Sequence, residues 1–116
     1  MESWNLREQE APHGARSPVV LHTADEARAV LIVLEPGQSL GDHEVKENAY
    51  LTVIEGSVRV ELPDRTMDAT AGTFLVFGPS ERHAITSDGG ARLLLLLAPW
   101  PGEGHYRGEE MVDRKT

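Results

Sequence analysis

Two histidines, His43 and His83, are the side chains in this sequence that are best suited to chemistry. An imidazole that is neutral near pH 7 can act as a general base, and it is also a frequent ligand of divalent metals. Each histidine follows a glycine-led stretch, which begins at Gly37 for His43 and at Gly72 for His83. Because the chain contains no cysteine, a thiol nucleophile, a disulfide and cysteine-bound zinc are excluded.

Other kinds of site find no support in the sequence. There is no Gly-x-Ser-x-Gly elbow, no phosphate-binding loop and no paired-glycine dinucleotide fingerprint. The run Ser80-Glu81-Arg82-His83 contains the residue types of a catalytic triad, but neighbours in sequence do not have triad geometry. The formal net charge of −8, with no basic cluster to offset it, disfavours nucleic acid as a partner.

The chain also shows no sign of a membrane or secretion signal. Its N-terminal sequence lacks a basic region followed by an apolar one, and no apolar run approaches the ~18 residues that span a bilayer. A length of 116 residues is enough for one domain with one hydrophobic core. We therefore expect a soluble, cytoplasmic, single-domain protein.

The elements that must position His43 and His83 have the pattern of short β-strands separated by turns. Residues 58–62 alternate strictly between apolar and polar side chains, as a strand with one buried face does. No segment sustains a helical period, so the pattern predicts an all-β sandwich or closed barrel. Trp4 and Leu6 alternate with polar neighbours and could form a short N-terminal edge strand. The predicted strands are 19–22, 27–34, 49–54, 58–62, 73–77, 83–86 and 92–98.

The run of consecutive leucines at 93–97 predicts a strand that is covered on both faces. A strand with one face in water should alternate between apolar and polar side chains. The protein core accounts for one of the two faces. The other face needs the N-terminal segment, the C-terminal tail or a second subunit, and we expect a homodimer.

The two glycine–histidine stretches resemble the paired signature motifs of the cupins, in particular the small single-domain, cupin-2 type. The first cupin motif is Gly, five residues, His-x-His, three or four residues, Glu, six residues, Gly, and here Gly37, His43 and Gly56 hold its outline. The second is Gly, five residues, Pro-x-Gly, two residues, His, three residues, Asn, and Gly72 and His83 hold its outer spacing.

The resemblance covers about residues 27–98 and implies a double-stranded β-helix, the RmlC-like jelly-roll barrel. Together with the polar composition of both ends, it leads us to expect a partly ordered N-terminal arm at 1–17, the barrel at 18–100 and a polar C-terminal tail at 101–116.

This chain departs from the cupin motifs at the positions that bind metal. Val45 stands where the second histidine belongs, and Ala49 stands where the glutamate belongs. In the second motif Gly78, Ser80 and Ser87 replace the proline, the glycine and the asparagine. The resemblance implies three histidines and one carboxylate around Fe, Mn, Ni or Zn, of which only two histidines remain here.

Two sets of candidate residues follow from the resemblance and from strand alternation. A metal set would be His43 and His83 with Glu47 as a substitute carboxylate, and His22 and His105 lie outside both motifs. If His43 and Val45 face inward, one wall of the cavity is apolar. The predicted ligand pocket consists of His43, Val45, Tyr50, Thr52 and His83.

Three functions remain open on the sequence alone. The first is a binding module that holds a small organic molecule in an apolar barrel cavity, with no cofactor. The second is an enzyme: either a metal-dependent dioxygenase, isomerase or lyase with an altered site, or a metal-free enzyme with His43 or His83 as general base. The third is a structural dimer without a ligand.

Overall fold

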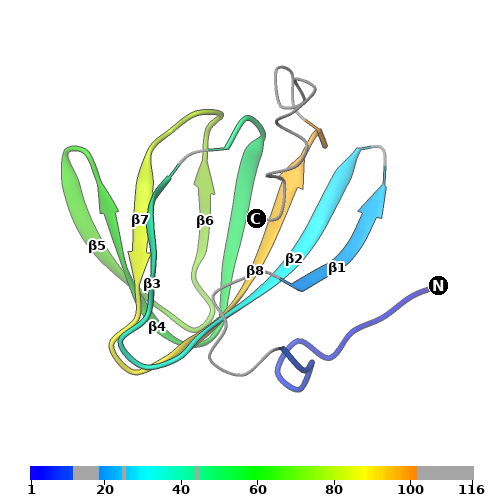
Figure 1. The fold of residues 1–116 in the computed structure, drawn as a ribbon, viewed down its shortest axis with the longest axis horizontal. Helices are drawn as coiled ribbons and strands as arrows, with labels where there is room; N and C mark the ends of the chain where they lie inside the picture. The colour runs from blue at the N-terminus through cyan, green and yellow to red at the C-terminus, as the bar shows by residue number, and fades with distance from the viewer. Residues whose placement is uncertain (12–18, 25, 44, 102–116) are drawn as a thin grey trace.

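The structure, a computed structural model, describes residues 1–11, 19–24, 26–43 and 45–101, with the backbone alone at 41–43. Within these ranges it contains eight β-strands and no helix, so no helix of the described residues could cross a membrane (Figure 1). This confirms the all-β class. The strands are β1 (Val19–Ala24), β2 (Ala27–Leu34), β3 (Ser39–His43), β4 (Asn48–Leu62), β5 (Arg65–Thr70), β6 (Phe74–Phe77), β7 (His83–Thr86) and β8 (Ala91–Ala98).

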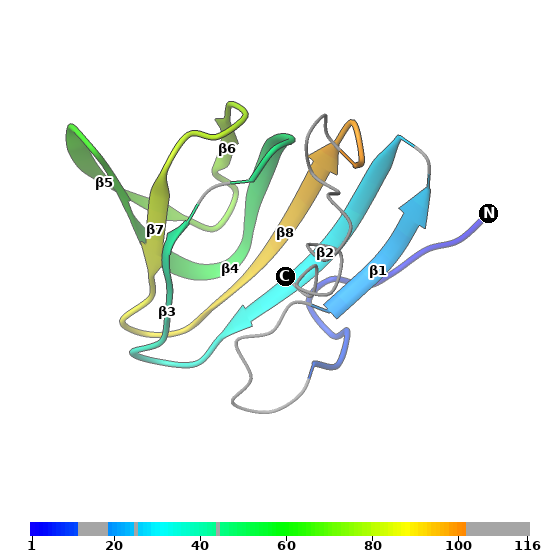
Figure 2. The ribbon, with the colours of Figure 1, turned by 45° about the horizontal axis from the view of Figure 1, so that its top comes forward.

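The strands form two antiparallel sheets that share β4. The first half of β4 lies between β8 and β6, which gives a first sheet in the order β1-β2-β8-β4-β6. The second half of β4 lies between β5 and β7, which gives a second sheet in the order β5-β4-β7-β3. Figures 1 and 2 show the two sheets curling toward each other from the bend in β4. The arrangement is a jelly-roll sandwich.

The bend in β4 lies at Gly56 and has a local steric cause. The pairing of β4 with β8 shifts between Val53 and Glu55, which marks a bulge, and Gly56 follows with a φ of 80°. Gly56 is also pressed against the turn before β8, because a Cβ at this position would lie 2.1 Å from the carbonyl oxygen of Gly90. Only glycine fits here, so one strand passes from sheet to sheet where the sequence predicted two strands and a turn.

Three further strand expectations differ from the structure: β3 (39–43) and β5 (65–70) are absent from the predicted strands, and the expected N-terminal strand does not form. Residues 65–70 were missed because β5 is mostly exposed and buries only Ala69. The N-terminal edge strand expected at Trp4 and Leu6 is wrong, because residues 6–8 form a turn. The Asn5 side chain accepts a hydrogen bond from the Arg7 N–H at 3.1 Å, and the Asn5 carbonyl accepts from Gln9 at 2.8 Å. These local bonds compete with strand formation.

The core lies between the inner faces of the two sheets. Leu93 and Leu97 are fully buried in it and Leu95 packs against it, whereas Leu94 and Leu96 point to the opposite face of the first sheet. One face of the leucine run therefore lies in the core, and the other lies on the outside of the first sheet. The core residues are Val30, Ile32, Leu34, Ala49, Leu51, Val53, Val58, Val60, Ala69, Phe77, Ile85, Ala91, Leu93, Leu97 and Trp100.

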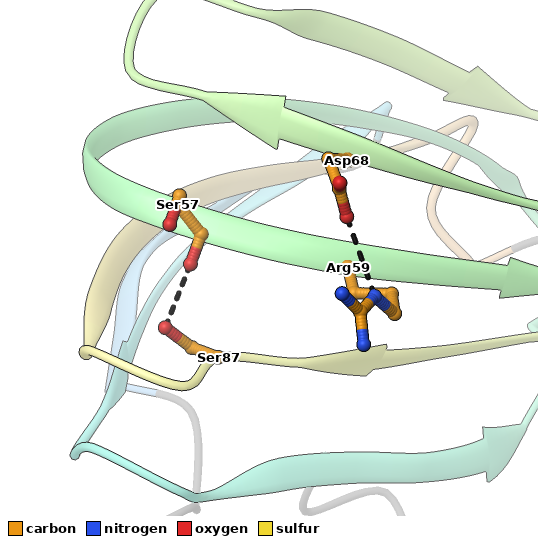
Figure 3. A network of polar contacts seen from close by, with 4 residues as sticks. All are labelled: Ser57, Arg59, Asp68 and Ser87. Atoms are coloured by element: carbon orange, nitrogen blue, oxygen red, sulfur yellow. Dashed lines mark hydrogen bonds and ion pairs between the residues drawn. The ribbon is translucent and has the colours of Figure 1, made fainter.

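Ser87 joins the turns at the end of the barrel opposite the histidines. Its hydroxyl donates to the carbonyl of Ser57 in β4 at 2.7 Å (Figure 3), and its backbone N–H donates to Gln38 at 3.0 Å. Its carbonyl accepts from the Gly37 N–H at 2.7 Å, and the residue is fully buried. Ser87 thus takes the structural place of the asparagine in the second motif.

The N-terminal residues cover part of the outer face of the first sheet. The Arg92 guanidinium on β8 donates to the carbonyls of Leu6, at 2.8 Å, and Gln9. A groove of about 820 Å³ lies between residues 3–7 and residues 52–54 of β4. The rest of this face stays open and apolar, with Phe74 59%, Val76 54% and Leu96 36% exposed.

Candidate functional site

The site is built at one end of the barrel, called here the site end, where β3 and β8 finish and β4 and β7 begin (top in Figure 1). The turn between β6 and β7 sets its geometry. The Glu81 N–H donates to the Gly78 carbonyl at 3.1 Å, and the turn has Pro79 at its second position and Ser80, with a φ of 64°, at its third. That is the pattern of a type II turn, which normally has glycine where Ser80 stands.

Two further contacts hold this turn in place. The Glu81 carboxylate accepts a hydrogen bond from the Gly78 N–H at 2.9 Å, so the side chain closes the turn a second time. The Ser80 N–H donates to the Val45 carbonyl at 2.6 Å, which ties the turn to the segment before β4. The segment that leads into β7 is therefore well anchored.

The turn determines the orientation and tautomer of His83. Its Nδ1 atom lies 3.0 Å from the Glu81 carbonyl oxygen. A carbonyl can only accept, so Nδ1 carries the hydrogen and, in the neutral ring, Nε2 carries the lone pair. The Phe77 ring stacks on the imidazole at 4.0 Å between centroids and 12° between planes, and His83 is only 5% exposed. His83 is thus a buried, oriented side chain with Nε2 as its acceptor.

The structure brings His43 and His83 together through their backbones. They are directly paired residues of the antiparallel strands β3 and β7. The imidazole of His43 lies outside the described side chains, so its direction is not part of the site geometry. The predicted residue His105 also lies outside the described residues.

The two positions where the motif loses its ligands are part of the core. Ala49 is buried and pairs with Phe77 on one side and Leu97 on the other, and Val45 packs against the same core. Glu47 lies between them in sequence, just before β4, and is fully buried. The site end therefore combines apolar walls with one buried carboxylate and one buried imidazole.

Tyr50 and Thr52 do not join this site, which corrects their assignment to the pocket. In the first half of β4 the buried residues are Ala49, Leu51 and Val53, so the residues between them face outward. The Tyr50 ring stacks on the exposed Phe74 ring, with 6.3 Å between their centroids. Thr52 lines the outer groove beneath the N-terminal residues.

His22 also lies away from the site. It is exposed on β1, where its Nδ1 atom lies 3.1 Å from a Glu2 carboxylate oxygen and its ring lies beside Trp4. Its neighbours are residues of the N-terminal segment and not the barrel interior.

Trp100 belongs to the site end, although no pattern in the sequence indicated this. It follows β8, is 4% exposed and is part of the core cluster. Its backbone N–H donates to the Glu26 carbonyl at 3.2 Å, and the Arg28 guanidinium lies 4.4 Å above its ring. The side chain therefore joins the core at the end of β8.

A metal is not supported by the residues that the structure describes. Among the described side chains, no three His, Cys, Asp or Glu residues are grouped so that they could hold a metal ion. His83 and Glu47 supply two donors, while Val45 and Ala49 supply none. A protein metal site normally has three or more ligands from the chain. The described residues therefore do not fit a metal centre by themselves.

Comparison with known proteins agrees with this architecture. The family model of the cupin domain matches residues 30–98 of this chain. No curated protein is significantly similar in sequence to this chain.

Several solved structures have the same fold. An RmlC-like cupin from Desulfovibrio desulfuricans is 25% identical with a TM-score of 0.73, over 85% of this chain and 97% of that one. An uncharacterised double-stranded β-helix protein from Klebsiella pneumoniae is 18% identical with a TM-score of 0.77, over 88% and 93% of the two chains. Protein SPY1581 from Streptococcus pyogenes, of unknown function, is 18% identical with a TM-score of 0.72, over 84% and 87%. With its two-sheet jelly roll and its paired motif histidines, this chain belongs to the cupin family.

Proposed function

We propose that this cupin binds a small organic molecule at the site end and has no resident metal. The observation that carries the proposal is the fate of the two lost ligand positions, since Ala49 is a core residue and Val45 packs against the core. Their side chains extend the apolar interior up to His83. An apolar wall with a few oriented polar groups is the usual composition of a small-molecule site.

His83 is the polar group that would orient such a ligand. Its Nδ1–H is engaged with the Glu81 carbonyl, which fixes the orientation of the ring that a ligand would meet. Phe77 stacks against one face of the imidazole and keeps it from rotating. Because the ring is buried, a hydrogen bond to it forms in a low-dielectric setting, where it discriminates strongly between ligands.

The test is to identify what the purified protein carries. Protein made without an affinity tag is examined by elemental analysis for transition metals and by native mass spectrometry for a co-purified organic molecule. We expect a substoichiometric metal content and a bound organic mass that is lost in His83→Ala. His22→Ala, which alters an exposed histidine on β1, serves as the matched control and should keep the bound mass.

A second candidate function is a metal-dependent cupin enzyme, a dioxygenase, isomerase or lyase, with His43, His83 and Glu47 as ligands. The observation in its favour is the fully buried carboxylate of Glu47 just before β4. In the same elemental analysis it requires stoichiometric metal in the natural protein and loss of that metal in both His43→Ala and Glu47→Gln. Glu55→Gln, which changes an exposed carboxylate in β4, is the control. This outcome would overturn the metal-free proposal.

We also propose that the protein is a homodimer through the outer face of the first sheet. Phe74, Val76 and Leu96 are exposed there beside Tyr50, and none of them is charged. Two copies with a net charge of −8 repel each other, so an uncharged apolar face is where they can meet most readily. An isologous pairing would bury the same residues in both subunits.

Sedimentation velocity at several concentrations tests the dimer. We expect a dimer for the natural protein and a monomer for Phe74→Asp, because a buried charge opposes pairing. Val20→Asp is the control, since Val20 is equally apolar and exposed but is paired with the inward-facing Val30. A natural protein that is monomeric at every concentration refutes the dimer.

A further inference from the structure

Trp100 contacts both the core and a cationic side chain at the site end. It belongs to the core cluster, and the guanidinium of Arg28 lies 4.4 Å above its indole ring. Arg28 is itself oriented by a hydrogen bond from its Nε atom to the Thr23 hydroxyl at 3.3 Å. The ring thus packs on an apolar floor, the core, and has a cation over one face.

Trp100 differs from every other described member of the core in its place in the fold. The other members lie in strands β2 and β4–β8, whereas Trp100 follows the end of β8. Its N–H donates to the Glu26 carbonyl, which is not a bond of a strand ladder. The indole can therefore leave the barrel without breaking any of the backbone bonds that pair β8 with β2 and β4.

We infer that the space filled by the Trp100 side chain is a binding site for a flat, uncharged aromatic ring, and that Trp100 is its displaceable occupant. This inference rests on the proposed function, because it concerns the same end of the barrel. The surroundings suit such a ring: the apolar floor excludes water, and the cation above favours a π face. An apolar cavity of this kind binds benzene-sized molecules in proteins.

Self-occupancy has a direct effect on binding. A ligand competes with the indole of the same chain. Its apparent affinity is therefore its intrinsic affinity multiplied by the fraction of molecules in which Trp100 is out of the site. Arg28 stabilises the closed state through its contact with the ring. The contact between Arg28 and Trp100 thus controls access to the barrel interior.

The first experiment removes the occupant. Trp100→Ala is unfolded by heat with and without indole, with Trp4→Ala, which truncates the exposed tryptophan, as control. At ten times its Kd, indole raises the folding constant about 11-fold, which for a chain of this length raises Tm by about 5 °C. We expect that shift in Trp100→Ala and a much smaller one in Trp4→Ala, where Trp100 competes with indole. A folded Trp100→Ala that does not respond to indole overturns the inference.

The second experiment tests displacement in the full chain. In Trp4→Phe the only remaining tryptophan is Trp100, and its emission is excited at a wavelength that benzene does not absorb. We expect saturating benzene, or the added substitution Arg28→Met, to raise the quenching of Trp100 by acrylamide several-fold. Unchanged quenching under both conditions makes Trp100 a permanent core residue and overturns the inference.

Two controls keep the outcomes distinct. If Trp100→Ala does not fold, Trp100→Leu, which leaves a smaller space, is tested with benzene in place of indole. A rise in Tm then supports the inference, and a folded Trp100→Leu that does not respond to benzene overturns it. Neither experiment depends on His83 or on a co-purified molecule. If the protein responds to indole and benzene but carries no co-purified molecule, the proposed function is contradicted and the displaceable Trp100 is supported. If it carries a co-purified molecule but does not respond to indole or benzene, the proposed function is supported and the displaceable Trp100 is contradicted.

Discussion

Gly56→Ala should destabilise this protein more than alanine at any other glycine with a similar backbone conformation. Gly56 is the corner of β4, with a φ of 80°, and an added Cβ would lie 2.1 Å from the carbonyl oxygen of Gly90. It would also lie 3.0 Å from the Cα atom of Ala91, so it meets backbone on two sides. Neither neighbour can rotate away as a side chain could.

The magnitude has two parts. A left-handed backbone costs an alanine about 1–2 kcal/mol relative to glycine. Relief of the steric overlap requires β4 and the turn before β8 to separate, and such overpacking costs about 1–3 kcal/mol. The sum of about 2–5 kcal/mol is a large part of the 5–15 kcal/mol by which domains are commonly stable.

Gly72→Ala separates these two parts. Gly72 has a φ of 95°, and a Cβ there would meet no atom within 4 Å, so it carries the conformational cost alone. Gly37→Ala, with a φ of 84° and equally open surroundings, repeats the control. Urea unfolding followed by circular dichroism gives the free energy of unfolding of all three variants and of the natural protein.

We expect Gly56→Ala to lose at least about 1 kcal/mol more than either control, because only it has the overlap term. A Gly56→Ala protein that fails to fold while both controls fold agrees with the same reasoning. Equal losses in the three variants would refute it, since the contact with the Gly90 carbonyl would then have no energetic consequence.

Three further predictions can be tested by the same unfolding experiment. Ser87→Ala removes a buried hydroxyl that donates to a β4 carbonyl and should cost about 1–3 kcal/mol, whereas Asp68→Ala, which breaks an exposed ion pair between β5 and β4, should cost at most about 1 kcal/mol (Figure 3). Ser80→Gly should leave stability unchanged or raise it by up to about 1 kcal/mol, because it relieves a φ of 64°; a clear loss would contradict the turn type. Leu97→Ala should cost about 2–5 kcal/mol and Leu96→Ala clearly less in the monomer, and equal losses would contradict the assigned faces of β8.

The class of fold followed from the sequence because two independent signals agreed. The alternation at 58–62 and the frequent Gly and Pro turns predicted short strands, and the resemblance of Gly37, His43, Gly72 and His83 to the cupin motifs implied the jelly roll. β5 escaped detection because its sequence, RTMDAT, buries little and therefore carries little apolar pattern. An exposed strand is specified by its hairpin partner more than by its own composition.

The faces of β4 could have been predicted from the same motif. Ala49 stands where cupins have an inward-facing glutamate, so Leu51 and Val53 should also face inward, and Tyr50 and Thr52 should not. The bulge before Gly56 then reverses the alternation, and Val58 faces inward. A bulge depends on contacts with a second strand, which the local sequence does not reveal.

The role of Trp100 could not be predicted from the pattern. It lies outside every strand and beside two prolines, in a stretch that reads as the start of a polar tail. Its burial depends on where β8 ends relative to β2, which brings Arg28 and the Glu26 carbonyl beside it. The partners of Trp100 are distant in sequence, so only the three-dimensional fold identifies this residue as part of the site.

The continuity of β4 also constrains how the chain can acquire its structure. Both sheets contain β4, and its pairing partners β5, β6, β7 and β8 all follow it in the sequence. The second sheet cannot be complete before the chain has reached β7, nor the first before it has reached β8, so most of the folding barrier should come from closing long loops. The amide hydrogens of β4 on either side of Gly56 should then exchange with solvent at one common rate, as a single cooperative unit whose opening requires both sheets to come apart.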